Sequence, residues 1–204
     1  MTFNPQIPSW GKDFSENYIN ELLSYHSWLS TTGIKTGLIS PKNNQFIWDE
    51  FIVHSLYFYK IVNDLNILSQ NIFDLGTGGG IPGIPFGIVS NQEITLIDIK
   101  QKRIFELERL ISAQKLSNIS AIKEDAEILL KNNEHTIFLM RCYIPHSSLM
   151  NLLEKNIDNN KKNTFIVSSN ADTVNNLEDM FHVKQEKFLI NNNEYRYIDV
   201  ITVK

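Results

Sequence analysis

The residues best suited to chemistry lie in one glycine-rich stretch, residues 73–85 (FDLGTGGGIPGIP). Apolar residues lead up to an acidic residue, and five glycines then follow within eight positions. This pattern predicts a short strand that runs into a tight turn. Glycine lacks a Cβ atom, so Gly76, Gly78 and Gly80 can adopt positive φ and let a ligand approach their N–H groups, while Gly83 lets a following helix pack closely on the strand. We therefore predict a loop that holds a nucleotide-like ligand.

Two classes of cofactor use such a loop, and the acidic residue before it favours one of them. Residues 78–83 satisfy the G-x-G-x-x-G pattern of dinucleotide-binding proteins, which is a weak signal by itself. A longer pattern, D-x-G-x-G-x-G-x-P-G-x-P, begins at Asp74. A carboxylate at the strand tip would repel a pyrophosphate, whereas it suits the ammonium and sulfonium groups of S-adenosylmethionine. Asp74 therefore favours S-adenosylmethionine over NAD, and a glycine-rich turn without a ligand is the remaining alternative.

Acidic residues also follow the next two predicted strands. Asp98 ends the run 94–98, and in a doubly wound fold its carboxylate would lie beside the glycine loop as an acceptor for the two ribose hydroxyls of an adenosine. Residues 124–127 (EDAE) follow the third strand and open a helix, so their N–H groups and acidic side chains can meet an adenine edge. Both features also have a simpler explanation, because acidic side chains cap and stabilise helix starts without any ligand.

Arg141 ends the fourth predicted strand at the same edge. A lone arginine is usually a solvated surface residue, but at this place its guanidinium could bind a carboxylate, a phosphate or a guanine edge. We predict Arg141 as the catalytic residue, and Lys102, Arg103 and Arg196 as weak RNA contacts. The predicted cofactor contacts are Asp74, Gly76, Thr77, Gly78, Gly80, Ile81, Asp98, Ile99, Asp125, Ala126, Glu127 and Arg141.

Composition limits the remaining functional classes. At 204 residues and 42% hydrophobic content, the chain is long enough for one well-cored domain. Its 19 Lys and Arg against 23 Asp and Glu give a net charge of −4, so any RNA contact would have to be local. Cys142 is the single cysteine and the five histidines are scattered, which excludes an internal disulfide and predicts no metal site. Without a signal peptide or a long apolar run, we expect a cytoplasmic monomer that binds no membrane.

The first part of the chain predicts helices. After an irregular lead-in over residues 1–12, apolar residues recur at helical spacing over residues 13–30 and are dense over residues 46–60. We expect residues 1–70 to form a helical extension that packs on a cofactor-binding core, residues 71–204.

The core predicts an α/β fold. From residue 71, short β-rich runs alternate with helical ones, which is typical of a parallel, doubly wound sheet. After a last helical run at residues 172–181, two β-rich runs, 182–190 and 195–203, are separated by a connection that suits a hairpin. A mostly parallel, seven-stranded sheet that ends in an antiparallel hairpin is the pattern of Rossmann-like class I methyltransferases rather than of dehydrogenases.

Four motifs follow one another through most of the chain: DLGTGGGIPGIP from Asp74, LIDIKQKR over residues 96–103, the pair Ala126-Glu127, and Arg141. Together they resemble the bacterial 16S rRNA (guanine-N7)-methyltransferase family. The resemblance implies S-adenosyl-L-methionine as the cofactor, and methyl transfer to N7 of a guanine in the 16S rRNA of the 30S subunit. It also implies that the cofactor is contacted by Gly76, Ile81, Ala126, Glu127 and Arg141. Guanine N7 has a lone pair and no proton to lose, so this transfer needs alignment rather than a general base.

The chain departs from that family at two basic positions. Asp125 stands where the family has arginine before the Ala-Glu pair, and residues 168–170 (SSN) stand where it has Leu-Lys-Gly. Two residues thought to face RNA are therefore lost while the cofactor positions are kept. This leaves open a cofactor-binding paralogue that acts in assembly without methylating rRNA. An NAD-dependent oxidoreductase is a further alternative, because it shares the G-x-G-x-x-G pattern.

Overall fold

The computed structural model describes residues 3–67, 71–141, 145–156, 162–171 and 181–203. Cys142 and the helix predicted over residues 172–181 lie outside these ranges, except for Phe181, which begins a strand.

Seven strands form one sheet in the described residues, in the order β3-β2-β1-β4-β5-β7-β6. The first five of these in space pair in parallel, and β7 runs antiparallel to both of its neighbours, β5 and β6. The predicted mostly parallel sheet with a terminal antiparallel hairpin is confirmed. The strands are β1 (Asn71–Leu75), β2 (Ile94–Asp98), β3 (Ile119–Lys123), β4 (Thr136–Met140), β5 (Thr164–Ser169), β6 (Phe181–Leu189) and β7 (Tyr195–Val203).

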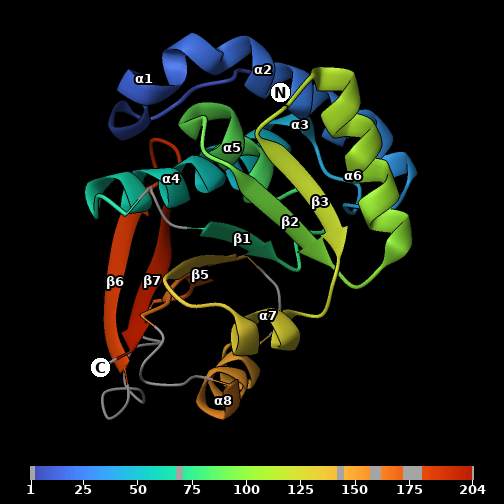
Figure 1. The fold of residues 1–204 in the computed structure, drawn as a ribbon. Coiled ribbons are helices and arrows are strands. Elements are labelled where there is room, and N and C mark those ends of the chain that lie inside the picture. Colours follow the sequence, from blue (N-terminus) through green and yellow to red (C-terminus); the bar gives the residue numbers. More distant parts are fainter. Residues whose placement is uncertain (1–2, 68–70, 142–144, 157–161, 172–180, 204) are drawn as a thin grey trace.

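Helices lie on both faces of this sheet (Figure 1). One face carries α4 (His54–Asp64), α5 (Gly83–Ser90) and α6 (Gln101–Gln114), and the other carries α7 (Ala126–Asn132) and α8 (His146–Asn156). This is the arrangement that a doubly wound sheet requires, because its central strands must be covered on both sides.

Side chains that point alternately to the two faces of each strand divide the core into two clusters. In β2, Leu96 packs into the cluster under α4, α5 and α6, whereas its neighbour Ile97 packs into the cluster under α7 and α8. The same switch occurs in β1 between Ile72 and Leu75. Successive strand side chains point to opposite faces, so one apolar strand supplies both cores.

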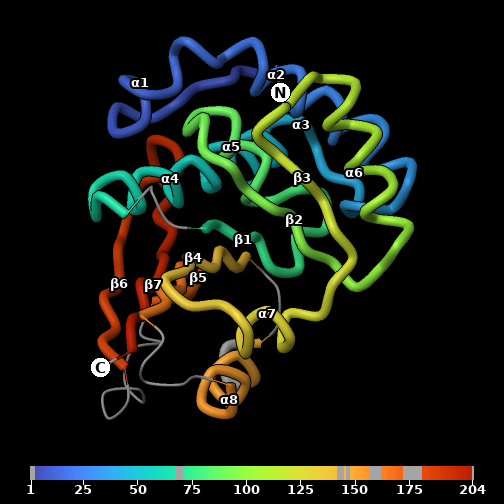
Figure 2. The backbone as a smooth tube through the Cα atoms, viewed as in Figure 1, coloured from blue at the N-terminus to red at the C-terminus, as the bar shows by residue number. Residues whose placement is uncertain are grey.

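The segment before the sheet forms an outer layer. α1 (Ser9–Ser15) and α2 (Ile19–Trp28) lie outside α4 and α5, on the face of the sheet that these two helices cover (Figure 2). The predicted irregular lead-in is wrong from Ser9 onward, because α1 begins there. A tertiary contact explains the difference: Trp10 Nε1 donates a hydrogen bond to the backbone oxygen of Leu189, at 2.8 Å.

Short helical pieces complete this layer. η1 (Glu16–Tyr18) joins α1 to α2, η2 (Leu29–Gly33) continues α2, and α3 (Asn44–Phe46) runs through the wider turns of η3 (Ile47–Val53) into α4. The helix predicted over residues 46–60 is therefore confirmed and extends further at both ends. The division into an extension over residues 1–70 and a core over residues 71–204 stays a prediction.

α5 approaches the sheet closely at two glycines. A Cβ atom on Gly83 would lie 2.3 Å from Leu96 Cδ2, and one on Gly87 would lie 2.6 Å from Ile119 Cδ1. Real Cβ atoms do not approach other carbons so closely, so both positions depend on the missing side chain. The predicted close packing after Gly83 is confirmed.

We expect Gly83→Ala to lower the free energy of unfolding by about 1–3 kcal/mol, the usual cost of forcing an extra methyl into a packed interior. Urea unfolding measures it. Gly33→Ala is the matched control, because a Cβ there would make only ordinary contacts of 3.4 Å or more. That variant should be neutral or more stable by about 0.4–1 kcal/mol. Equal stability losses for the two variants would contradict close packing at Gly83.

Candidate functional site

The carboxyl ends of β3, β2, β1 and β4 lie side by side at one edge of the sheet (Figure 1). The chain order reverses between β1 and β4, and open α/β sheets leave a ligand crevice at such a point. Every predicted cofactor contact falls at this edge. These residues are Asp74, Gly76, Thr77, Gly78, Gly80 and Ile81 around the end of β1, Asp98 and Ile99 at β2, Asp125, Ala126 and Glu127 after β3, and Arg141 after β4.

The glycine loop between β1 and α5 has the backbone conformation that the sequence predicts. Gly76, Gly78 and Gly80 have φ of 69°, 56° and 91°. A Cβ on Gly78 would meet nothing nearer than the Gly76 oxygen at 3.9 Å, so this part of the loop borders open space. The loop is also held from the far side, because the Tyr25 hydroxyl of α2 donates to the Gly79 oxygen at 2.8 Å. The sequence carried no signal for this Tyr25 contact.

Asp74 fastens the two ends of the loop together. Its Oδ2 accepts hydrogen bonds from Thr77 Oγ1 at 2.5 Å and from Gly83 N at 2.8 Å. The residue is fully buried, and burial raises the pKa of this carboxyl to about 7, against the hydrogen bonds from Thr77 and Gly83 that lower it. Its other oxygen, Oδ1, is buried without a hydrogen-bond partner among the described residues. Asp74 therefore shapes the loop, and a direct contact with a ligand's ammonium stays a prediction that only Oδ1 could fulfil.

Asp98 lies next to the loop, as predicted for the end of the neighbouring strand. The Thr77 N–H donates to the Ile97 oxygen at 3.0 Å, which ties the loop to β2. Asp98 is 3% exposed, and its carboxylate accepts from Lys100 N at 2.9 Å and from Arg103 Nη1 at 2.8 Å. A carboxylate can accept about four hydrogen bonds, so this one keeps capacity for further donors such as ribose hydroxyls.

The residues after β3 and β2 differ in their solvent exposure. Asp125 caps α7, since its Oδ1 accepts from the Glu127 N–H at 2.8 Å. The simpler explanation of this acidic cluster, helix capping, therefore holds for Asp125. Ala126 is buried, whereas Glu127 is exposed and Ile99 is 64% exposed. An exposed isoleucine beside Asp98 provides an apolar surface of the kind that a flat base can cover.

Arg141 enters a cluster that the sequence analysis missed. Its Nη2 is 3.4 Å from Glu50 Oε2, its Nε is 3.5 Å from His54 Nδ1, and its guanidinium lies over the Phe51 ring at 5.1 Å. Arg196 of β7 reaches the same carboxylate and donates to Glu50 Oε1 at 2.9 Å through Nε. Glu50, His54, Arg141 and Arg196 form the Glu50 cluster.

Glu50 is the negative centre of the Glu50 cluster. Burial by itself would raise the pKa of Glu50, but the hydrogen bonds from Arg196 and the nearby positive charges outweigh burial and lower the pKa to about 2. Burial lowers the pKa of His54 to about 4, so this imidazole is neutral at pH 7. Its Nε2 is buried without a hydrogen-bond partner among the described residues. The two guanidiniums therefore supply the charge that balances Glu50.

One sequence signal could have found Glu50. It is an acidic residue inside a largely apolar helical run, four positions before His54, so both side chains share a helix face. What no local pattern shows is its partner Arg196, which lies 146 residues further along the chain.

The predicted RNA contacts have different surroundings. Lys102 is exposed at the start of α6. Arg103 lies 2.8 Å from Asp98 in an ion pair, and Arg196 is held by Glu50 and Glu194. RNA contact by these residues stays a prediction, and for both arginines it would compete with an existing carboxylate partner.

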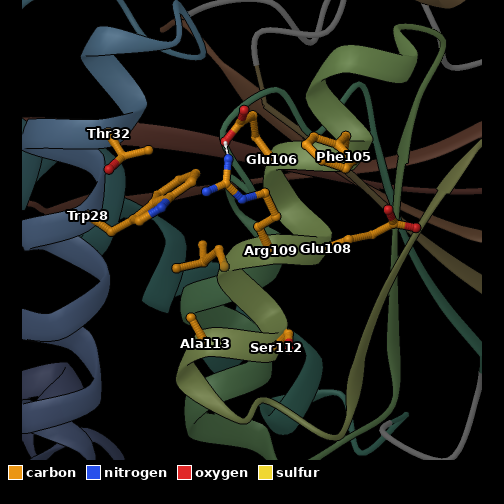
Figure 3. A pocket seen from close by; sticks show the side chains of 9 residues that line it. Trp28, Thr32, Phe105, Glu106, Glu108, Arg109, Ser112 and Ala113 are labelled. Atoms are coloured by element: carbon orange, nitrogen blue, oxygen red, sulfur yellow. Dashed lines mark ion pairs between the residues drawn. The ribbon is translucent and has the colours of Figure 1, made fainter.

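Cavities away from this edge contain none of the predicted site residues. One of about 520 Å³ lies between the end of α2 and the outer side of α6, where Trp28 and Thr32 face Arg109 and its ion-pair partner Glu106 (Figure 3). Another of about 490 Å³ is lined by Phe3 and residues 43–45. The candidate site is therefore defined by the loop and the strand ends.

The described residues contain neither a metal-ligand cluster nor a helix that could span a membrane. No group of three or more His, Cys, Asp or Glu side chains is placed to hold a metal ion. Within the same ranges, no helix has the length and apolar character needed to cross a lipid bilayer.

A family model described as rRNA small subunit methyltransferase G matches residues 18–194. The chain belongs to this family. The match includes the glycine loop, Asp98, the Ala126-Glu127 pair and, of the Glu50 cluster, Glu50, His54 and Arg141. Membership of the rRNA small subunit methyltransferase G family does not favour the alternative of an NAD-dependent oxidoreductase.

Curated relatives carry the same name. A ribosomal RNA small subunit methyltransferase G from Chlorobium chlorochromatii is 33% identical over 120 residues, covering 58% of this chain and 50% of that protein. One from Karelsulcia muelleri is 36% identical over 103 residues, covering 50% of this chain and 46% of that protein. The chain thus spans about half the length of the curated relatives that it matches.

Solved structures share the fold. The human methyltransferase 10 domain containing protein aligns with a TM-score of 0.59 at 12% identity, over 89% of this chain and 98% of that one. A mutant of MtNAS in complex with S-adenosylmethionine aligns with a TM-score of 0.57 at 12% identity, over 94% of this chain and 76% of that one. These likenesses support the α/β Rossmann-like methyltransferase fold.

We expect Glu50→Gln to destabilise the protein by about 2–3 kcal/mol, because it leaves two guanidiniums without their shared negative partner. The value lies below the usual 3–5 kcal/mol for a broken buried pair, since the Arg196 side chain is 33% exposed. Glu194→Gln is the matched control: it removes an exposed partner of the same arginine and should cost less than about 1 kcal/mol. Urea unfolding measures the stability of both variants. Equally small losses of stability would contradict the central place of Glu50 in the cluster.

Because His54 is neutral in the folded protein, we also expect the stability of the protein to depend on pH. Its pKa is about 4 in the folded protein and 6.5 in the unfolded chain, so the unfolded chain takes up the proton first and stability falls as pH drops from 6.5 towards 4. Asp74 acts in the opposite direction, because its raised pKa favours the folded state as pH drops from about 7 towards 3.8.

The test therefore compares variants rather than the unchanged protein alone. His54→Asn should remove the His54 contribution, so the variant should lose less stability than the unchanged protein between pH 6.5 and pH 4. The same substitution at the exposed His182 is the control for replacing a histidine by asparagine. Superimposable pH profiles for all three proteins would show that His54 is not held neutral.

Proposed function

We propose that this protein is an S-adenosylmethionine-dependent methyltransferase that acts on N7 of a guanine in the 16S rRNA of the small ribosomal subunit. The observation that carries the proposal is the open glycine loop, bordered by Asp98 and Ile99 on one side and by Arg141 on the other, in a chain of the rRNA small subunit methyltransferase G family. The proposed setting is the cytoplasm, with the 30S subunit as the partner and the protein acting as a monomer.

The residues at the sheet edge fit S-adenosylmethionine. The N–H groups of the loop from Gly76 to Gly80 would hold the methionine end, where Gly78 leaves room. Asp98 would accept the ribose hydroxyls, and Ile99 would cover one face of the adenine. Thr77, Ile81, Asp125, Ala126 and Glu127 complete the proposed contacts, with the last two at the adenine edge.

When bound, S-adenosylmethionine supplies an electrophilic methyl group on a sulfonium. The protein's task is then alignment, because guanine N7 already carries the lone pair that attacks and releases no proton. Arg141 is the proposed catalytic residue: its fork would bind the carboxylate of the methionine end or the guanine edge. The Glu50 cluster supports this by restricting where that guanidinium can lie.

Methyl transfer tests the proposal directly. Radiolabelled S-adenosylmethionine is incubated with 30S particles that lack the modification and, separately, with naked 16S rRNA. The methylated site is then mapped by reverse transcription after borohydride and aniline treatment. We expect transfer to 30S particles in preference to naked rRNA, since Asp125 and Ser169 stand where the family has basic residues, so few phosphates would be neutralised. Cofactor binding without transfer to either substrate would contradict the rRNA assignment.

We expect Arg141→Lys to slow that transfer by about 10- to 150-fold, which corresponds to the 1.5–3 kcal/mol of a hydrogen bond to a charged group. Lysine keeps the charge and its attraction to Glu50 but loses the planar fork. Arg109→Lys is the control, because Arg109 pairs with Glu106 on the outer side of α6 and not at the site. An unchanged rate in a folded Arg141→Lys variant would remove Arg141 from the site.

We expect Asp98→Ala to weaken binding of S-adenosylhomocysteine by about 1.5–3 kcal/mol in a calorimetric titration. Arg103→Ala separates ligand binding from the ion pair within the protein. It removes the partner of Asp98 but leaves the carboxylate, so affinity should be kept or improved. If both variants weaken binding equally, Asp98 acts only by holding Arg103.

A further inference from the structure

The hairpin of β6 and β7 exposes two tyrosines and a lysine on one face. Tyr195 and Tyr197 are alternate residues of β7, so their side chains share a face, and Lys187 of β6 pairs directly with Tyr197 across the hairpin. Tyr195 is 49% exposed, Lys187 is exposed, and Tyr197 is partly exposed. These three residues form the tyrosine platform.

The tyrosine platform combines aromatic faces with a cation. Lys187 Nζ lies 4.2 Å from the centroid of the Tyr195 ring and 5.9 Å from that of Tyr197. The two tyrosines are about 7 Å apart along the strand, so each presents its ring separately. Proteins that bind single-stranded nucleic acids use this combination on open sheet faces, where bases stack on aromatic rings and cations meet the phosphates.

The tyrosine platform lies on the same sheet edge as the candidate site. Tyr197 pairs with Ser169 at the end of β5, and Val167 of β5 pairs with Met140, the last residue of β4 before Arg141. Two strand spacings, about 10 Å, therefore separate β7 from the strand that carries Arg141. Arg196, between the two tyrosines, points to the other face and joins the Glu50 cluster.

The carboxylates around the tyrosine platform are engaged elsewhere. Glu194 is 3.0 Å from Arg196, and Glu186, on the opposite face of β6, is 2.7 Å from Lys184. Asp199 is fully buried and accepts a hydrogen bond from Gln185 at 2.9 Å. Among the residues that the structure describes, the side chain that presents charge beside the two rings is Lys187, so the tyrosine platform suits an anionic polymer with stacking groups.

We propose that the tyrosine platform binds single-stranded RNA, with Tyr195 and Tyr197 stacking on bases and Lys187 pairing with a phosphate beside the methylated guanine. The proposal rests on the proposed function, because it places the flanking nucleotides of that substrate. It also explains how a protein with a net charge of −4 engages RNA: stacking supplies affinity that does not require many phosphate contacts.

The test is a fluorescence anisotropy titration of the full chain with a labelled single-stranded oligoribonucleotide of about 10 nucleotides, from about 50 to 200 mM salt. Tyr195→Ala should weaken binding about tenfold without changing the salt slope, because it removes a stacking surface and no charge. Lys187→Gln should reduce the slope by about 0.7, the value for one phosphate contact on a single strand.

Two further variants serve as matched controls. Tyr195→Phe keeps the ring and should bind as the unchanged protein does. Phe105→Ala removes an aromatic side chain of similar exposure, 54%, on α6 at the other side of the sheet, and should have no effect on oligoribonucleotide binding. Equal binding by Tyr195→Ala and the unchanged protein, or no binding by either, would overturn the proposal.

Methyl transfer to 30S particles is measured on the same variants. If Tyr195→Ala slows transfer to 30S particles but binds the oligoribonucleotide normally, the tyrosine platform contacts a protein and the RNA proposal is overturned. If the unchanged protein binds the oligoribonucleotide through the platform but methylates neither 30S particles nor rRNA, the proposed function fails while the platform stands. The two proposals can therefore fail separately.

Discussion

The candidate site depends on one buried carboxylate. Asp74 accepts hydrogen bonds from Thr77 and from the first N–H of α5, at Gly83, and so closes the glycine loop on itself. The absence of a Cβ at Gly83 gives this carboxylate its room, since a methyl there would lie 2.7 Å from Asp74 Oδ2. A strand, a loop and a helix are thereby joined at one point, and the direction of the loop N–H groups follows from it.

The helices before the sheet contribute directly to that edge. Tyr25 holds the loop through the Gly79 oxygen, and Glu50 holds Arg141 and Arg196 from two strands that are not neighbours. Such contacts fix long side chains that would otherwise lose conformational entropy on binding a ligand. The N-terminal residues thus act as part of the site's support, and Glu50 neutralises part of the positive charge near the crevice before any ligand arrives.

Many features of the fold and site were readable because their signals are local. The strand bounds follow from apolar runs of about five residues, the hairpin from two β-rich runs with a short connection, and the loop from glycines that adopt positive φ. The residues at the ends of parallel strands can also be predicted from local patterns, because the fold class itself brings those ends to one edge of the sheet. The placement of Asp98 and Arg141 at this edge needed nothing further.

The sequence by itself thus determined the sheet, the glycine loop and which residues reach its edge. Tertiary structure alone decided what those residues touch. Tyr25 meets Gly79, Arg196 meets Glu50, and α1 begins at Ser9 because of the Trp10 contact with Leu189, which is 179 residues away. The reason is physical: propensity and periodicity act over a few residues, whereas a buried charge or an indole N–H takes whichever partner the packed chain brings within about 3 Å.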